Sequence, residues 1–152
     1  MKKKEIQYCF ILLLFIASSM FTYGQKEQVI LTQEEKELFE NADETEETDE
    51  TSESEYDIVI MDIGFNTWLN RIAQPKGYYS QQFMEQRNYL YVLEWNRRVL
   101  EPRTFDPNLY ELQINYEHNV DYGYDVNYQL YNYFIYFQRR YNQRLGPFLP
   151  RI

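Results

Sequence analysis

The chain has 152 residues, of which 44% are hydrophobic and 18% aromatic, and its 15 basic and 24 acidic residues give a net charge of −9. This length and apolar content fit one domain with a modest core. With one cysteine and one histidine, the sequence excludes a disulfide framework and a cysteine-based zinc cluster. We therefore predict no cofactor and no metal, and the acidic balance argues against nucleic acid as a partner.

Residues 1–24 are predicted to be a secretory signal peptide. Three lysines at 2–4 precede the unbroken apolar run CFILLLFIA, and small residues lie just before Gln25. The apolar run is shorter than the roughly 20 residues that a helix needs to span a bilayer, so we expect no stable transmembrane span after cleavage. The protein is therefore predicted to be exported and to be periplasmic, envelope-associated or extracellular.

Residues 25–55 carry most of the negative charge, because their 13 acids and two bases give a net of −11, whereas residues 56–152 hold ten of each. Thr32 followed by Glu35 is the pattern of a capping box, and it predicts a short helix over 33–40. The stretch NADETEETDETSESE that follows has too few apolar residues to offset the entropy of folding. We expect this acidic segment to be a largely disordered linker.

Residues 56–152 form the predicted aromatic-rich globular domain, which contains 14 tyrosines, six phenylalanines and two tryptophans. The β-branched run YDIVIMD predicts a strand over 56–62. A short helix is expected over 65–73, before the turn residues Gln-Pro-Lys-Gly. A second strand is predicted over 110–117, where apolar and polar residues alternate.

Two longer helices are predicted in the same domain. The first covers 80–100, with Ser80 as its N-cap. The second covers 126–145, where apolar residues recur at helical spacing between an N-cap at Asp125 and a Gly-Pro pair after the end. We therefore predict an α+β fold in a small single domain, with two main helices packed on a short, mostly antiparallel sheet.

The order of these segments resembles that of a known family. A signal peptide and an acidic spacer precede YDIVIMDIGFNTWLN and then DYGYDVNYQLYNYF. This arrangement is similar to a small family of exported bacterial proteins of unknown function, and the similarity covers residues 56–152. The resemblance implies an exported bacterial context, and it supplies no activity and no functional residues.

Catalytic motifs are scarce in the predicted domain. Ser80 and His118 are its single serine and histidine, and the serine lies outside any G-x-S-x-G elbow. Acids such as Glu94, Glu117 and Asp121 are candidates for glycan hydrolysis. This reaction needs two carboxyl groups at a defined distance from each other, and the sequence does not give that distance. No catalytic residue is assigned, and we expect a binding protein rather than an enzyme.

The arginine and tyrosine content favours a binding role. Nine of the ten basic residues in the domain are arginine, which stacks on aromatic rings and bridges carboxylates. The leading prediction is a non-catalytic interaction module of the cell envelope, whose partner is an envelope protein or a second copy. The alternative is a glycan-binding or carboxylate-dependent glycan-hydrolysing protein, with Trp68, Tyr78 and Tyr79 stacking on the ligand.

Overall fold

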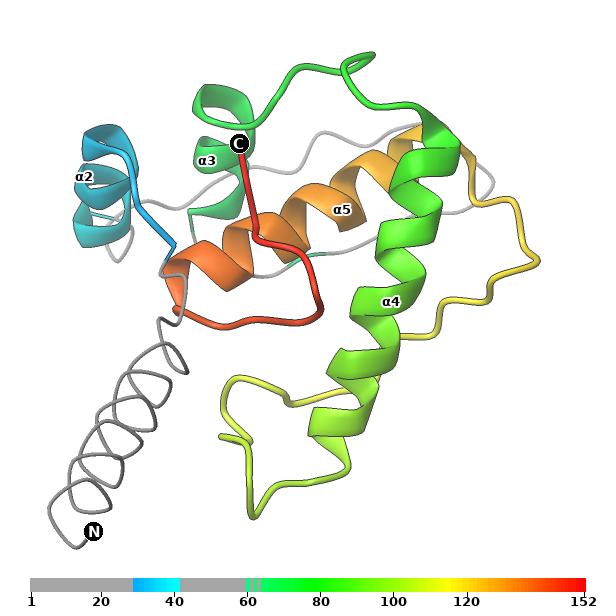
Figure 1. Ribbon diagram of the computed structural model, residues 1–152. Helices are drawn as coiled ribbons and strands as arrows, with labels where there is room; N and C mark the ends of the chain where they lie inside the picture. The colour runs from blue at the N-terminus through cyan, green and yellow to red at the C-terminus, as the bar shows by residue number, and fades with distance from the viewer. Residues whose placement is uncertain (1–28, 42–59, 61, 63) are drawn as a thin grey trace, which may run out of the picture.

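A computed structural model of the chain describes residues 29–41, 60, 62 and 64–152. Its four helices in these ranges are, in chain order, α2 (Gln33–Asn41), α3 (Phe65–Arg71), α4 (Gln81–Val99) and α5 (Gly123–Arg140). Figure 1 shows α5 in the middle of the molecule, with α4 on one side of it and α3 and α2 on the other. Contacts between α4 and α5 and between α3 and α5 make α5 the central helix of the fold.

The predicted α+β fold is wrong, because the part of the chain that the structure describes is all helical and contains no sheet. The strand predicted over 56–62 lies mostly outside the described residues, and its two described positions, Ile60 and Asp62, have no regular secondary structure. The two main helices were predicted correctly, but they pack on each other and on α3 instead of on a sheet.

The strand predicted over 110–117 is also wrong, and the side chains of α4 explain why. The Asn96 side chain accepts the Ile114 N–H at 2.8 Å and donates to the Ile114 carbonyl at 2.9 Å. The Trp95 indole N–H donates to the Leu112 carbonyl at 2.9 Å. Because α4 side chains satisfy backbone groups that a neighbouring strand would otherwise pair, this segment lies along the helix without forming a ladder.

Helix α4 begins where the sequence predicted. The Ser80 hydroxyl accepts the N–H of Phe83 at 3.2 Å, and the helix continues to Val99. Met84, Tyr91 and Trp95 are buried on one side of it. Their spacing of seven and four residues places them on the face that packs against α5.

Replacing Ser80 with alanine should lower the free energy of unfolding by about 1 kcal/mol, because one N–H of the first turn would lose its acceptor. Ser80→Asp is the matched control, since aspartate also caps helices and should retain most of the stability. Urea denaturation followed by circular dichroism measures both. Equal stability of the alanine variant and the parent would show that this cap contributes nothing.

Helix α5 differs from its prediction at both ends. It begins at Gly123, so Asp125 lies in its first turn rather than at the cap. It ends at Arg140, and Asn142 then adopts a φ of 49°, a left-handed conformation that asparagine tolerates. The chain turns back so that the Leu145 N–H donates to the Gln138 side chain at 2.8 Å. Leu145 is therefore buried, as its spacing suggested, although it lies beyond the helix.

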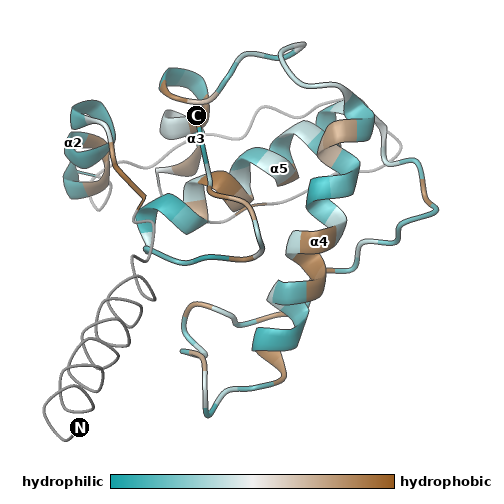
Figure 2. Cartoon of the chain, viewed as in Figure 1, coloured by the Kyte–Doolittle hydropathy of each residue, from teal (hydrophilic) through white to brown (hydrophobic). Residues whose placement is uncertain are grey.

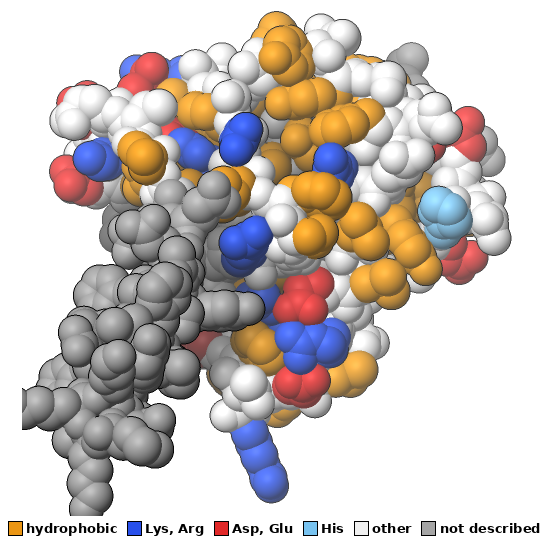
Figure 3. Space-filling model, viewed as in Figure 1, with side chains coloured by type: hydrophobic (Ala, Val, Ile, Leu, Met, Phe, Trp, Pro, Cys, Tyr) orange, Lys and Arg blue, Asp and Glu red, His pale blue; other side chains and the backbone are white. Residues whose placement is uncertain are grey.

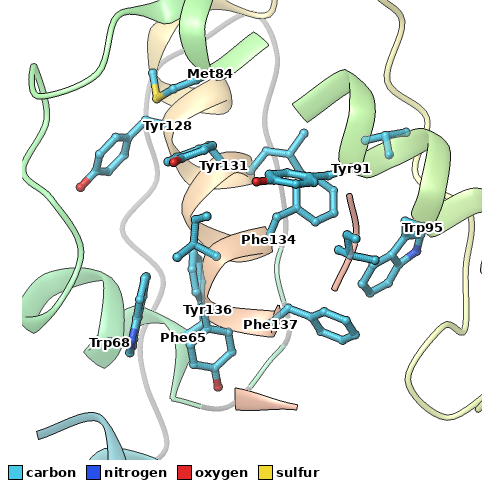
Figure 4. Close-up of a cluster of buried hydrophobic side chains, with 14 of the residues drawn as sticks. Phe65, Trp68, Met84, Tyr91, Trp95, Tyr128, Tyr131, Phe134, Tyr136 and Phe137 are labelled. Atoms are coloured by element: carbon cyan, nitrogen blue, oxygen red, sulfur yellow. The ribbon is translucent and has the colours of Figure 1, made fainter. Parts of the chain in front are cut away.

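Aromatic side chains from three helices form the core around α5 (Figure 4). Trp95 lies with its ring centroid 4.8 Å from that of Phe137, and Trp68 lies 5.7 Å from Tyr136, both in edge-to-face geometry. This arrangement brings the positive ring edge onto the negative face and adds to the stabilisation from burial. Ten aromatic residues therefore fill the interior: Phe65, Trp68, Tyr91, Trp95, Tyr110, Tyr128, Tyr131, Phe134, Tyr136 and Phe137.

The helix predicted from the capping box is present as α2, and it is mostly hydrophilic (Figure 2). The Thr32 hydroxyl accepts the N–H of Glu35 at 3.2 Å, and the Glu35 carboxylate accepts the N–H of Thr32 at 2.9 Å. This reciprocal pair confirms the capping box. Helix α2 contacts α3, so it lies against the rest of the fold.

Candidate functional site

The three residues that the sequence proposed for ligand binding lie in two different places. Trp68 is fully buried, and its indole N–H donates to the Glu35 carboxylate at 3.1 Å, so it has no exposed face for a ligand. Tyr78 and Tyr79 are together in the turn before α4, with ring centroids 4.7 Å apart. Tyr78 is 61% exposed, whereas Tyr79 is half-buried and stacks on Phe83. Ligand binding by this tyrosine pair stays a prediction.

A buried ion pair joins α2 to α5. The guanidinium of Arg139 donates to both carboxylate oxygens of Glu35 at 2.5 Å, and the two side chains are 5% and 0% exposed. Burial alone would raise the pKa of the Glu35 carboxyl, but hydrogen bonds from Arg139, Thr32 and Trp68 outweigh it and lower that pKa below its ordinary value. Glu35 is therefore ionised and fully occupied by protein donors, which suits a structural role.

Arg139 also ties the two ends of the described chain together. Its remaining N–H groups donate to the carbonyl of Pro150 at 2.8 Å and to the carbonyl of Ile30 at 3.0 Å. The helix predicted over 126–145 contains this arginine, but the sequence did not indicate its partner, which is 104 positions away. The available signal was an arginine that directly follows the apolar run FIYFQ, where an unpaired charge would be costly to bury.

A second acid, Asp62, lies beside the C-terminal end of α5. The hydroxyls of Tyr136 and Tyr141 donate to its two oxygens at 3.0 and 3.1 Å. Burial raises the pKa of Asp62, although the two phenols and the nearby Arg140 favour its charged form. Acids with a raised pKa occur at catalytic sites, but here each oxygen already accepts a phenol, and the contacts hold the segment before α3 onto α5.

Three polar side chains connect α4, α5 and the loop between them. The amide nitrogen of Asn88 donates to the side chain of Asn127 at 3.2 Å, and the Tyr116 hydroxyl donates to the same Asn127 oxygen at 2.7 Å. Asn88 and Asn127 are fully buried. Burial, with the nearby charge of Glu85, raises the pKa of Tyr116 to about 12.

We expect the protein to lose stability above about pH 10, where unfolded tyrosine ionises. The pKa of Tyr116 is raised to about 12 in the fold, and burial raises those of Tyr131 and Tyr136 in the same direction. As the pH rises through this range, the unfolded chain releases protons that the folded chain keeps, so the free energy of unfolding falls. Urea unfolding across this pH range measures the slope, and Tyr116→Phe should make it shallower. An unchanged slope would contradict the assignment to Tyr116.

The outer face of α4 exposes leucines among polar side chains. Leu90 and Leu93 are 39% and 52% exposed, and Leu100, directly after the last residue of α4, is 70% exposed; all three lie on the side that points away from α5. We refer to these three residues as the α4 leucine face. Figure 3 shows hydrophobic side chains gathered over this side of the molecule.

Two segments that contact α4 also expose apolar side chains. Leu112, which is 77% exposed, belongs to the segment held by Trp95, and Phe148, which is 37% exposed, lies under the guanidinium of Arg87. Together with the α4 leucine face, these account for five of the seven large hydrophobic residues that are exposed in the described part of the chain. Exposed apolar area is therefore concentrated on α4 and beside it.

Charged groups lie within the α4 leucine face, between Leu93 and Leu100, and at its two ends. Arg97 lies between Glu94 and Glu101, with ion-pair distances of 2.8 and 2.9 Å. At the other end, the guanidinium carbon of Arg87 lies 3.2 Å from the ring centroid of Phe148, and its Nη1 is buried without a hydrogen-bond partner. The face thus has an acidic group at one end and a cation at the other.

Metal-binding and membrane-spanning features are missing from the described ranges. No group of three or more His, Cys, Asp or Glu side chains there could hold a metal ion, and none of the described helices has the length and apolarity to cross a bilayer. The predicted signal peptide at 1–24 and most of the predicted acidic linker lie outside those ranges.

Comparison with known proteins identifies a family without a known activity. Residues 11–148 match the family DUF6146, which is described as a family of unknown function. No curated protein and no solved structure matches the chain. The match covers the whole acidic segment at 25–55 and all but the last four residues of the aromatic-rich domain at 56–152.

Proposed function

Because the chain belongs to this family of unknown function, DUF6146, we propose its role from the structure: a non-catalytic interaction module of the cell envelope. The observation that carries this proposal is the α4 leucine face, in which two leucines of α4 and the leucine at its C-cap are 39–70% exposed. Soluble monomers rarely expose a large contiguous apolar patch, and such patches mark binding surfaces. The apolar run at 9–17 supports export as part of the same proposal.

The spacing on α4 suits a helical partner. Leu90, Leu93, Arg97 and Leu100 follow one another at steps of three, four and three residues. This is the repeat with which two helices pack side by side, since each step returns the side chain to the same face. The partner is therefore a helix with an apolar stripe and charged flanks.

Two of the three acids that the sequence offered for catalysis, Glu94 and Asp121, are occupied by protein contacts, which supports a role in binding. Glu94 pairs with Arg97 and Arg98, and Asp121 accepts the Gln81 amide at 2.7 Å and the Gly123 N–H at 2.9 Å. The glycan alternative has less support, because Trp68 and Trp95 are 0% and 6% exposed. Of the three aromatic residues proposed to stack on a glycan, Tyr78 is the one that is well exposed.

Photo-crosslinking in the cells that produce the protein tests this proposal. A photoreactive residue at Leu93 or Leu100 should give a discrete adduct with a polypeptide in the envelope fraction. The control position is Glu37, which is exposed on α2 and lies outside the α4 leucine face. Absence of adducts at both leucines, or equal adducts at Glu37, would overturn the proposal.

A further inference from the structure

We infer, on the basis of the proposed function, that the partner helix is α4 of a second copy and that the two helices run antiparallel in a symmetric dimer. A two-fold interface uses the same surface on both subunits, so every contact occurs twice. The α4 leucine face must then be complementary to itself. The order of its residues and the charges at its ends meet this requirement in the antiparallel direction.

The order of residues favours the antiparallel direction over the parallel one. With the two helices antiparallel, Leu90 lies opposite the partner's Leu100, and Leu93 lies opposite the partner's Arg97. The long aliphatic stem of Arg97 can then cover a leucine while its guanidinium stays with Glu94 and Glu101. In a parallel pair, Arg97 would lie opposite the partner's Arg97, which brings two like charges together inside an apolar stripe.

The charges at the ends of the face agree with the same register. The antiparallel arrangement brings Arg87 beside the partner's Glu101, and this contact occurs at both ends of the interface. Arg87 is partly exposed and forms no ion pair with the described part of the chain. The side chain of Glu101 is 43% exposed, so it can accept a second cation besides Arg97. The dimer thus supplies a carboxylate to a cation that has none among the described residues of its own chain.

The flanking segments enlarge the interface. Leu112 and Phe148 are 77% and 37% exposed on the two sides of α4. Covering them along with the three leucines would remove most of the exposed apolar side chains of the described chain from water. Burial of apolar surface is the main driving force for association of this kind.

Sedimentation velocity of the full exported protein, purified from the producing cells, tests the dimer. We expect twice the mass of the single chain at micromolar concentration. Leu93→Asn should raise the dissociation constant of the dimer by about tenfold or more, as truncation of a central apolar contact does. Tyr78→Asn is the matched control, because it changes an exposed aromatic residue away from α4 and should leave the dimer intact. Circular dichroism checks that both variants keep their helices.

Cysteine crosslinking tests the antiparallel register without disturbing the charges. In a Cys9→Ser background, Leu90→Cys and Leu100→Cys proteins should each form no covalent dimer when oxidised alone. A mixture of the two should form a covalent heterodimer, because these positions face each other across the two-fold axis. Covalent dimers from Leu90→Cys alone would show a parallel arrangement and overturn the inference.

The two proposals fail in different ways. If the protein stays monomeric at high concentration while Leu93 still crosslinks to a polypeptide of another mass, the dimer is wrong and the interaction module stands. If neither association nor any adduct at Leu93 is seen, the proposed function fails as well.

Discussion

Replacing Glu35 with glutamine should lower the free energy of unfolding by about 3–5 kcal/mol, which is the cost of leaving a buried charge without its partner. Arg139 is 5% exposed in the ion pair, so it cannot turn to water when the carboxylate is removed. Glutamine keeps the size of the side chain, and the loss therefore reports the charge rather than a cavity. Urea denaturation measures the difference.

Glu34→Gln is the matched control for this substitution. Glu34 is the neighbouring residue on α2 and pairs with Arg71 at 2.9 Å, but the two side chains are 49% and 56% exposed. Exposed ion pairs contribute about 0–1 kcal/mol, so this variant should unfold close to the parent. Similar losses in the two variants would show that burial of the Glu35 pair has no energetic consequence.

The Glu35→Gln variant should also respond differently to acid. The pKa of Glu35 is lowered in the fold from its ordinary value of 4.5. Its contribution to stability is therefore present above that value and is lost as the pH falls through the lower folded pKa. The difference in stability between the parent and Glu35→Gln should narrow in this acidic range. A constant difference would contradict the ionised state of Glu35.

Replacing Phe134 with alanine should cost about 3–5 kcal/mol, the usual cost of truncating a buried aromatic residue. Phe134 is fully buried in α5, and its ring centroid lies 5.4 Å from that of Tyr91 and 6.1 Å from that of Trp95 on α4. The substitution therefore leaves a cavity between the two main helices. Thermal and urea unfolding, followed by tryptophan fluorescence, measure the loss.

Two further variants keep this prediction interpretable. Phe134→Leu retains part of the side-chain volume and should cost clearly less than the alanine variant, so it is usable if the alanine variant fails to fold. Tyr78→Ala removes an aromatic ring that is 61% exposed, and it should change the stability by about 1 kcal/mol or less. A Phe134→Ala protein as stable as Tyr78→Ala would contradict the central position of α5.

Features that depend on a few neighbouring residues were predictable from the sequence. Ser80 caps α4 through an N–H three residues away, and Thr32 and Glu35 cap α2 in the same way. In α4, Met84, Tyr91 and Trp95 follow one another at steps of seven and four residues, a spacing that is sufficient to predict the buried face. Each of these signals is satisfied within a few helical turns, so it does not depend on the rest of the fold.

Features that depend on distant partners were not predictable. The alternation at 110–117 is typical of a strand, and only the position of Asn96 on α4 shows that a side chain replaces the partner strand. The acidic segment was treated as solvated because its charge count cannot reveal that Glu35 is buried against an arginine 104 positions away. The leucines on the outer side of α4 follow the same helical periodicity as its core face. The sequence prediction nevertheless assigned binding to aromatic residues, because the aromatic content of the chain is high.

The contacts of Arg139 have a consequence for the order in which the chain assembles. This one side chain binds Glu35 and the carbonyls of Ile30 and Pro150, so its contacts are complete only when Pro150 is available. On a ribosome, which delivers the chain from its N-terminus, α2 emerges more than a hundred residues before its docking partner Arg139. In a nascent chain that ends before residue 139, Glu35 of α2 has no Arg139 with which to pair. Contacts between residues so far apart in the sequence are slow to form in folding.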